Sequence, residues 1–210
     1  MKRLLVALVG LVAVCAFSTN AVAHNRRPLQ HMTIFGDSVA SALDWVPSAK
    51  AEVKKGNRVT FELHPCGRLS SPGCLGNGQP PSVLKSVKSL GRRIGPTVVV
   101  LVGYNDDPHI YAAGIKKVLN AMHRRGVQHA LWLTLRPVYK QYRITNSVIR
   151  GASHRYPWMT VVPWGNYSWS HKSWFASDGI HFNSTGAEQF ALYVHRTLKS
   201  MGLTGPKPRS

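Results

Sequence analysis

Three short stretches of this 210-residue sequence carry side chains that could act together in nucleophilic catalysis. They are Gly36-Asp37-Ser38, Gly103-Tyr104-Asn105-Asp106 and Asp178-Gly179-Ile180-His181. Ser38 is a weak nucleophile until a base removes its proton. His181 is a candidate base, because imidazole accepts and returns protons near neutral pH. Asp178 would hold the other ring nitrogen and stabilise the cation, so these residue types predict a serine nucleophile with a histidine base.

Each of these residues also has an ordinary structural explanation. Asp37 or Ser38 could cap a helix or orient a turn. His181 could pack beneath the last helix, and Asn105 and Asp106 could be turn and cap residues. These alternatives stay open for each residue alone. The catalytic interpretation depends on whether the fold brings the stretches together.

The pattern of apolar residues predicts the strands and helices that would position these side chains. Strands are expected at residues 32–35, 58–63, 97–102, 130–135 and 159–162. Helices are expected at 39–54 with a break near Pro47, at 83–90 after a Ser82 cap, from Pro108 after an Asp107 cap, at 139–154, and after a capping box at 185–188. An aromatic loop with Trp164, Tyr167, Trp169, Trp174 and Phe175 precedes the last helix.

This alternation predicts an α/β domain with three α/β/α layers and a flavodoxin-like, doubly wound parallel sheet of about five strands. Ligands of such sheets bind beyond the carboxyl ends of the strands. Ser38 follows the first predicted strand, Gly67 comes soon after the second, and Asn105 follows the third. Asp178 and His181 follow the fifth strand through a loop. We therefore expect all five residues at one edge of the sheet.

These motifs resemble those of the SGNH (GDSL-like) hydrolase superfamily, and most closely its secreted or membrane-tethered bacterial domains with esterase or acyltransferase chemistry. The nucleophile, Gly-x-Asn-Asp and Asp-x-x-His blocks are matched in order by the three stretches above. The glycine block is matched by Cys66-Gly67-Arg68, where the cysteine loop departs from the commonest form. The resemblance covers nearly all of the sequence after residue 23. It implies the SGNH hydrolase fold, with Ser38, Asp178 and His181 as catalytic residues.

Attack by Ser38 would create an oxyanion that needs hydrogen-bond donors. The resemblance implies three: the backbone N–H groups of Ser38 and Gly67 and the side-chain amide of Asn105. Losing one such donor typically costs about 2.7–4 kcal/mol of barrier. The chemistry requires no metal and no organic cofactor.

The amino-terminal residues predict export. Lys2 and Arg3 precede an apolar run at 4–17, and Ala21-Val22-Ala23 matches a small-x-small cleavage site. The run is too short to span a membrane, so residues 1–23 are expected to be a signal peptide. An uncleaved signal anchor is the alternative. Residues 24–203 would then form one hydrolase-like domain without a transmembrane segment, secreted or in the periplasm or cell envelope, and residues 204–210 a basic tail.

The two cysteines that follow the signal peptide, Cys66 and Cys74, are expected to form a disulfide, because paired cysteines in exported chains are usually oxidised. Two free thiols are the alternative. Zinc binding is poorly supported, because no second Cys or His pair has ligand spacing.

The composition is strongly basic, with 27 Lys and Arg against 8 Asp and Glu, a formal net charge of +19. Such a surface concentrates near polyanions. In an exported protein we expect anionic cell-envelope polymers or acidic lipid head groups rather than nucleic acid. Arg68 could bind an acidic substrate group or be one more solvated arginine. The Trp-rich stretch could stack on sugar rings or pack in the core.

Three functions compete on these grounds. The first is an exported serine esterase that hydrolyses an acyl ester, of a short acyl group on a carbohydrate or cell-envelope glycan. The second is an O-acyltransferase that uses the same site with a sugar hydroxyl as acceptor. The third is a cationic cell-wall-binding module with a vestigial site. The sequence identifies no substrate-binding residues.

Overall fold

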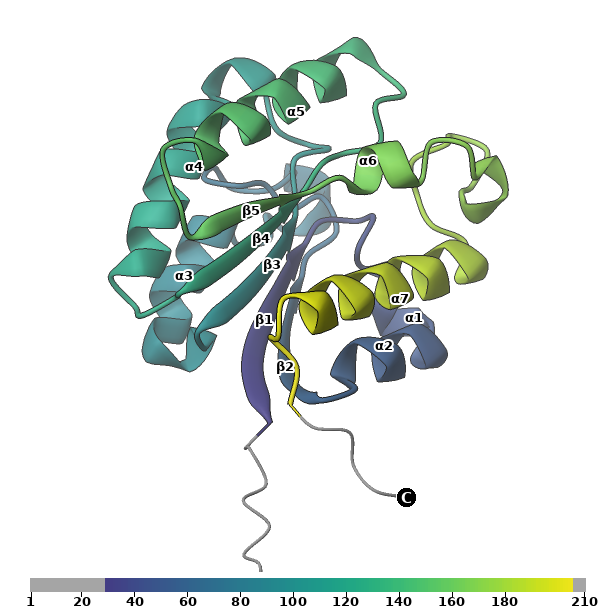
Figure 1. The fold of residues 1–210 in the computed structure, drawn as a ribbon. Helices are drawn as coiled ribbons and strands as arrows, with labels where there is room; N and C mark the ends of the chain where they lie inside the picture. Colours follow the sequence, from purple (N-terminus) through teal and green to yellow (C-terminus); the bar gives the residue numbers. More distant parts are fainter. Residues whose placement is uncertain (1–28, 206–210) are drawn as a thin grey trace, which may run out of the picture.

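The computed structural model describes residues 29–205, so the expected signal peptide and residues 206–210 of the expected tail lie outside it. The described residues form one sheet of five parallel strands, in the order β2-β1-β3-β4-β5. The strands are β1 (Gln30–Gly36), β2 (Asn57–Leu63), β3 (Thr97–Leu101), β4 (His129–Leu133) and β5 (Met159–Val162). Figure 1 shows the sheet between two groups of helices.

The central strand β3 explains why the sheet is covered on both sides. Its sequence, TVVVL, is buried at every position. Val99 and Leu101 belong to one apolar core, and Val98 and Val100 belong to the other. Successive side chains of a strand point to opposite faces, so an unbroken apolar run needs helices on both.

The helices divide between these two cores (Figure 1). On one face lie α1 (Ala42–Trp45), α2 (Pro47–Lys54) and α7 (Ser184–Ser200), and on the other lie α3 (Val83–Leu90), α4 (Pro108–His123) and α5 (Lys140–Ser153). The predicted three-layer α/β/α fold with a parallel five-stranded sheet is therefore confirmed. In the described residues, no helix is long and apolar enough to cross a membrane.

Local signals placed several helix boundaries correctly. The break near Pro47 separates α1 from α2. Ser82 caps α3 by accepting from the N–H of Lys85 at 3.3 Å. Asp107 caps α4, with Pro108 in the first turn. These caps satisfy backbone N–H groups that have no partner inside the helix.

The predicted capping box at residues 185–188 is wrong. Helix α7 begins earlier, and its cap is Asn183, whose side-chain oxygen accepts from the N–H of Gly186 at 2.9 Å. Glu188 instead accepts a hydrogen bond from the hydroxyl of Ser48 in α2, at 2.6 Å. A tertiary contact between two helices therefore takes the carboxylate that the local pattern assigned to a cap.

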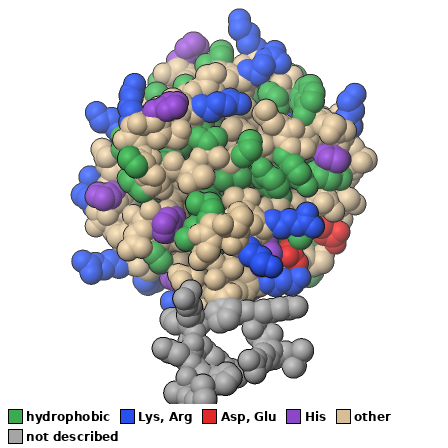
Figure 2. Space-filling model, viewed as in Figure 1, with side chains coloured by type: hydrophobic (Ala, Val, Ile, Leu, Met, Phe, Trp, Pro, Cys, Tyr) green, Lys and Arg blue, Asp and Glu red, His purple; other side chains and the backbone are tan. Residues whose placement is uncertain are grey.

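The surface reflects the basic composition. On the face shown in Figure 2, Lys and Arg side chains are spread widely, whereas Asp and Glu side chains are seen at one place. Two of the acids face inward: Asp37 is fully buried, and Asp106 is partly buried. The described surface is therefore strongly cationic.

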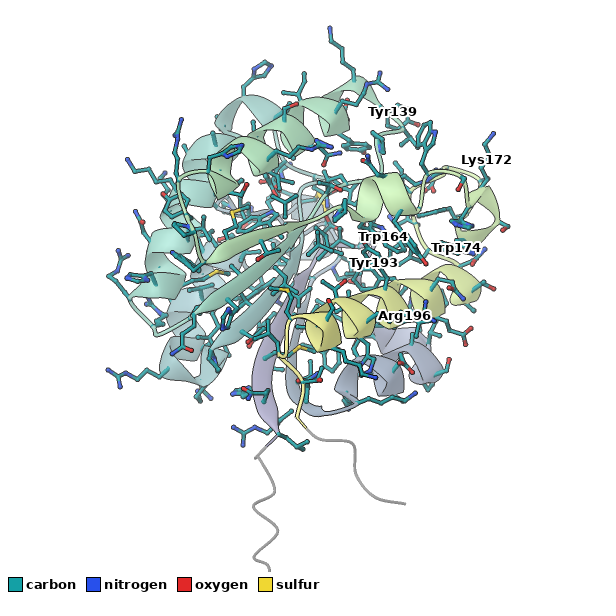
Figure 3. All side chains as sticks on the ribbon, viewed as in Figure 1. Tyr139, Trp164, Lys172, Trp174, Tyr193 and Arg196 are labelled. Atoms are coloured by element: carbon teal, nitrogen blue, oxygen red, sulfur yellow. A yellow bond between two sulfur atoms is a disulfide. The ribbon has the colours of Figure 1, made fainter. Side chains whose placement is uncertain are left out.

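The aromatic stretch after β5 is a short helix, α6 (Trp164–Tyr167), followed by a single 3-10 turn at Lys172–Trp174, rather than a simple loop. Trp164 is fully buried. Its ring stacks on Trp174 at 6.2 Å between centroids and contacts Tyr193 of α7 at 5.5 Å (Figure 3). Core packing explains these rings, whereas Trp169 remains 51% exposed.

The predicted disulfide between Cys66 and Cys74 is confirmed, with Cα atoms 5.6 Å apart. It closes a loop that follows β2 and includes Gly67. Cys66 has a positive φ of 60°, a backbone conformation that side-chain-bearing residues rarely adopt. The bridge therefore fixes a tight turn at the carboxyl edge of the sheet.

Candidate active site

Ser38 and His181 meet at the carboxyl edge of the sheet, although 143 positions separate them in the sequence. Ser38 lies in the turn between β1 and α1, and His181 lies just before α7. The Ser38 hydroxyl is 2.9 Å from Nε2 of His181, and Nδ1 of His181 is 2.6 Å from the Asp178 carboxylate. A proton on Nδ1 that points at Asp178 leaves Nε2 able to accept the Ser38 proton.

Asp178 is held by its own turn. Its carboxylate also accepts from the N–H groups of Ile180, at 2.8 Å, and His181, at 3.1 Å. Partial burial acts to raise the pKa of Asp178, but the hydrogen bonds from His181 and Ile180 outweigh it and lower that pKa. Asp178 is therefore an anion at neutral pH. The side chains of His181 and Asp178 are 48% and 41% exposed, so the site is open to solvent.

Asp37 orients the turn that carries Ser38. It is fully buried and accepts three backbone hydrogen bonds: from Val39 at 3.1 Å, and from Gly103 and Tyr104 at 3.2 Å each. Burial raises the pKa of Asp37 to about 7, although the backbone donors act to lower it. The Asp37 carboxylate has no hydrogen bond to the His181 ring. Asp37 thus joins the ends of β1 and β3.

The three expected oxyanion donors lie in different environments. Among the described residues, the N–H of Ser38 has no acceptor. The Asn105 amide donates to the Gly67 carbonyl at 3.3 Å, which places Asn105 beside the disulfide loop. The N–H of Gly67, however, donates to the carbonyl of His64 at 2.7 Å. The Ser38 N–H therefore has no acceptor, the Asn105 amide retains one of its two N–H groups, and the Gly67 N–H is already engaged.

Comparison with known proteins identifies the fold. No protein-family model matches the sequence, and a search of curated proteins finds no match. Solved structures do match over most of the chain. The C-terminal catalytic domain of peptidoglycan O-acetyltransferase A from Streptococcus pneumoniae has a TM-score of 0.61 at 17% identity, covering 86% of this chain and 98% of that domain. This is the SGNH hydrolase fold.

Two further solved structures match this chain over a similar length. TesA has a TM-score of 0.62 at 19% identity, and the carbohydrate acetylesterase Est24 from Sinorhizobium meliloti has 0.62 at 12%. Each match covers 82% of this chain and 99% of the other. The predicted resemblance to SGNH hydrolases is confirmed for the fold.

Asp106 has a role in this SGNH fold that its local sequence did not indicate. Both of its carboxylate oxygens accept from the N–H of Leu69, at 3.0 and 3.1 Å. This contact ties the disulfide loop to the end of β3. Burial raises the pKa of Asp106 to about 6, although the Leu69 hydrogen bond and the Arg68 charge act to lower it. Asp106 also closes the expected turn, because its N–H donates to the Gly103 carbonyl at 3.3 Å, but the cap of α4 is Asp107.

Arg136, after β4, is a site residue that the sequence analysis missed. It is buried, and its guanidinium donates to the carbonyls of Gly179, at 2.6 Å, and Trp169, at 3.0 Å. The same group lies 4.3 Å from the ring centroid of Phe175. Arg136 therefore supports the turn between Asp178 and His181. One feature of the sequence could have indicated it: Arg136 is a charged residue that directly follows the strand predicted at 130–135. Its position is therefore at the carboxyl edge of the sheet, where the other candidate residues lie.

Within residues 29–205, no three His, Cys, Asp or Glu side chains are grouped closely enough to hold a metal ion.

The raised pKa of Asp106 predicts a pH effect on stability. Between its unfolded value near 3.8 and about 6, the folded protein retains a proton that the unfolded chain releases. By linkage, the free energy of unfolding contributed by Asp106 decreases as pH rises through this window. Asp106→Asn keeps an acceptor for Leu69 and cannot titrate. Wild type should therefore lose on the order of 1–2 kcal/mol relative to this variant between pH 4 and 7.

Urea unfolding of both proteins across this range measures the difference. His31, whose pKa is lowered by burial and by the Arg58 charge, is present in both proteins, so its own pH dependence cancels. The Asp106 charge also contributes to the raised pKa of Asp37, so removing it changes the stability difference in the same direction. A stability difference that stays constant from pH 4 to 7 would show that Asp106 does not titrate as described.

Proposed function

We propose that this chain is an exported serine esterase that cleaves a short acyl ester of a carbohydrate or cell-envelope glycan through an acyl-Ser38 intermediate. The observation that carries the proposal is the hydrogen-bonded series from the Ser38 hydroxyl through the His181 ring to the Asp178 carboxylate. Its position beyond the carboxyl ends of the strands, where α/β proteins bind ligands, supports this assignment.

In the proposed first step, Ser38 Oγ attacks the ester carbonyl carbon while Nε2 of His181 takes the hydroxyl proton. Asp178 stabilises the resulting imidazolium through Nδ1. The carbonyl oxygen becomes an oxyanion, which the N–H of Ser38 and the amide of Asn105 receive. Gly67 adds its N–H if that bond turns from the His64 carbonyl toward the substrate. The intermediate collapses, His181 protonates the alcohol oxygen, and the alcohol leaves.

In the second step, His181 takes a proton from water, and the hydroxide attacks the acyl group on Ser38. Collapse of this second intermediate releases the acid and returns the proton to Ser38. The open site supports hydrolysis, since water reaches His181 directly. The scheme uses no cofactor.

The proposed substrate class rests on three supports. The matched structures include a carbohydrate acetylesterase and a peptidoglycan acetyltransferase domain. The ring of Trp169, half exposed, lies over the guanidinium of Arg136, beside the Asp178–His181 turn, and could contact a sugar ring. The cationic surface favours an anionic polymer as the carrier of the ester.

The proposed location is outside the cytoplasm. We propose residues 1–23 as a signal peptide, 24–203 as the hydrolase domain and 204–210 as a tail. The Cys66–Cys74 disulfide supports export, because disulfides persist in oxidising compartments.

Transfer of the acyl group to a sugar hydroxyl is the second candidate function. The likeness to the peptidoglycan O-acetyltransferase domain supports it. Both functions share the acyl-Ser38 intermediate and differ in the group that accepts the acyl chain. Product analysis with added glycan separates them, because hydrolysis yields free acid alone. The third candidate, a binding module with a vestigial site, requires a protein that neither turns over esters nor depends on Ser38.

Removing either the nucleophile or the base should abolish ester cleavage. Ser38→Ala and His181→Ala should each lower kcat for p-nitrophenyl acetate and butyrate by on the order of 10³-fold or more. Ser147→Ala and His154→Ala, at exposed positions on and just after α5, are the matched controls and should retain wild-type rates. Full activity in Ser38→Ala would rule out the proposed mechanism.

Arg136 should act on the rate by positioning the Asp178–His181 turn. Arg136→Lys keeps the charge but cannot donate to both the Gly179 and Trp169 carbonyls in the same geometry. We expect kcat to fall on the order of ten-fold with little change in KM. Arg143→Lys, an exposed arginine of α5 that donates to the Pro137 carbonyl, is the control. Equal effects of the two substitutions would contradict a positioning role for Arg136.

A further inference from the structure

We propose that the amino-terminal edge of the sheet, opposite Ser38, is a docking surface for a phosphodiester polymer of the cell envelope. We call it the arginine edge and define it by Arg58, Arg92, Arg93, Arg124 and Arg125. This inference extends the proposed export of the protein but does not depend on its catalytic activity.

The topology brings these arginines together. Arg58 lies at the start of β2, where it is paired in register with His31 of β1. Arg92 and Arg93 lie just before β3, and Arg124 and Arg125 lie just before β4. These strands are neighbours in the sheet and parallel, so their amino ends share one edge. Ser38 and Asn105 follow the carboxyl ends of β1 and β3, at the other edge.

Two hollows mark the arginine edge. One, of about 450 Å³, is lined by Arg92, Gly95, Pro96, His123, Arg124, Arg125 and Gly126. The other, of about 590 Å³, is lined by His31, Arg58, Thr60, Leu90, Arg92 and Arg93. Arg92 borders both, so the hollows adjoin. Together they offer a continuous cationic surface that an extended polymer could follow.

The charge at this edge is not neutralised locally. Neither hollow is lined by Asp or Glu. Burial and the nearby charge of Arg58 both lower the pKa of His31, as expected where positive charge is unopposed. Arg125 donates one hydrogen bond to the Ala121 carbonyl, and its buried Nε has no partner within the described residues.

The residue type points to phosphate as the recognised group. All the permanently charged residues that line the hollows are arginines, although lysines are common elsewhere on the protein. The planar guanidinium binds phosphate through two parallel hydrogen bonds, which an ammonium group cannot do. A row of such groups fits a polymer with repeating phosphodiesters better than a neutral glycan.

Both ends of the described chain lie at this edge (Figure 1). β1 starts at Gln30, and the N–H of Gly205 donates to the carbonyl of Gly56, next to the start of β2.

Binding of a fluorescent poly(glycerol phosphate) chain to the Ser38→Ala protein tests the proposal without any contribution from catalysis. Affinity should fall steeply with added salt, as expected for release of counterions. Arg92→Glu/Arg124→Glu, at two exposed positions, should weaken binding about ten-fold or more. Lys116→Glu/Lys117→Glu, an equal charge change at exposed positions of α4, should have no more than about a two-fold effect.

Three outcomes would overturn the proposal. Equal loss of affinity in the two double variants would mean that net charge alone determines binding. Equally tight binding of poly-L-glutamate would remove the preference for phosphate. Equally tight binding to phosphatidylglycerol vesicles, lost in the arginine variant, would assign the edge to a membrane surface. Thermal unfolding of each variant verifies that it is folded.

Discussion

The buried carboxylate of Asp37 is the contact on which the arrangement of the site depends. It accepts from Val39 in its own turn and from Gly103 and Tyr104 after β3, so it fixes the two central loops relative to each other. Ser38 is the next residue, and its orientation follows from this network. A buried carboxylate is costly unless it is hydrogen-bonded or protonated, which explains both the three donors and the raised pKa.

The fold and the meeting of the candidate residues at one edge of the sheet could be predicted from the sequence, because both follow from patterns that are local or topological. The unbroken apolar run of β3 indicated a strand covered on both faces, and parallel strands must end at one edge. At that edge, the Ser38 hydroxyl lies 2.9 Å from Nε2 of His181. The remaining details depend on tertiary contacts. Arg136 belongs to no motif and is recognised only by the two carbonyls that it reaches. Glu188 bonds to Ser48 of another helix, and the Gly67 N–H to His64.

The two edges of the sheet carry different chemistry for a simple topological reason. In a parallel α/β sheet, the loops at the carboxyl ends are free to hold polar side chains around a site, whereas those at the amino ends connect helices back to strands. Here the loops at the carboxyl ends hold Asp37, Asp106 and Asp178. Those at the amino ends are rich in arginine. A polymer bound at the arginine edge would leave the catalytic edge open.

The most direct measurement of the central claim is reaction of the purified protein with a fluorophosphonate probe, followed by intact mass and peptide mapping. The account predicts one adduct, on Ser38, formed much more slowly in His181→Ala and at the wild-type rate in Ser147→Ala. An adduct on another residue, or no adduct on wild type, would contradict the assignment of Ser38 as an activated nucleophile.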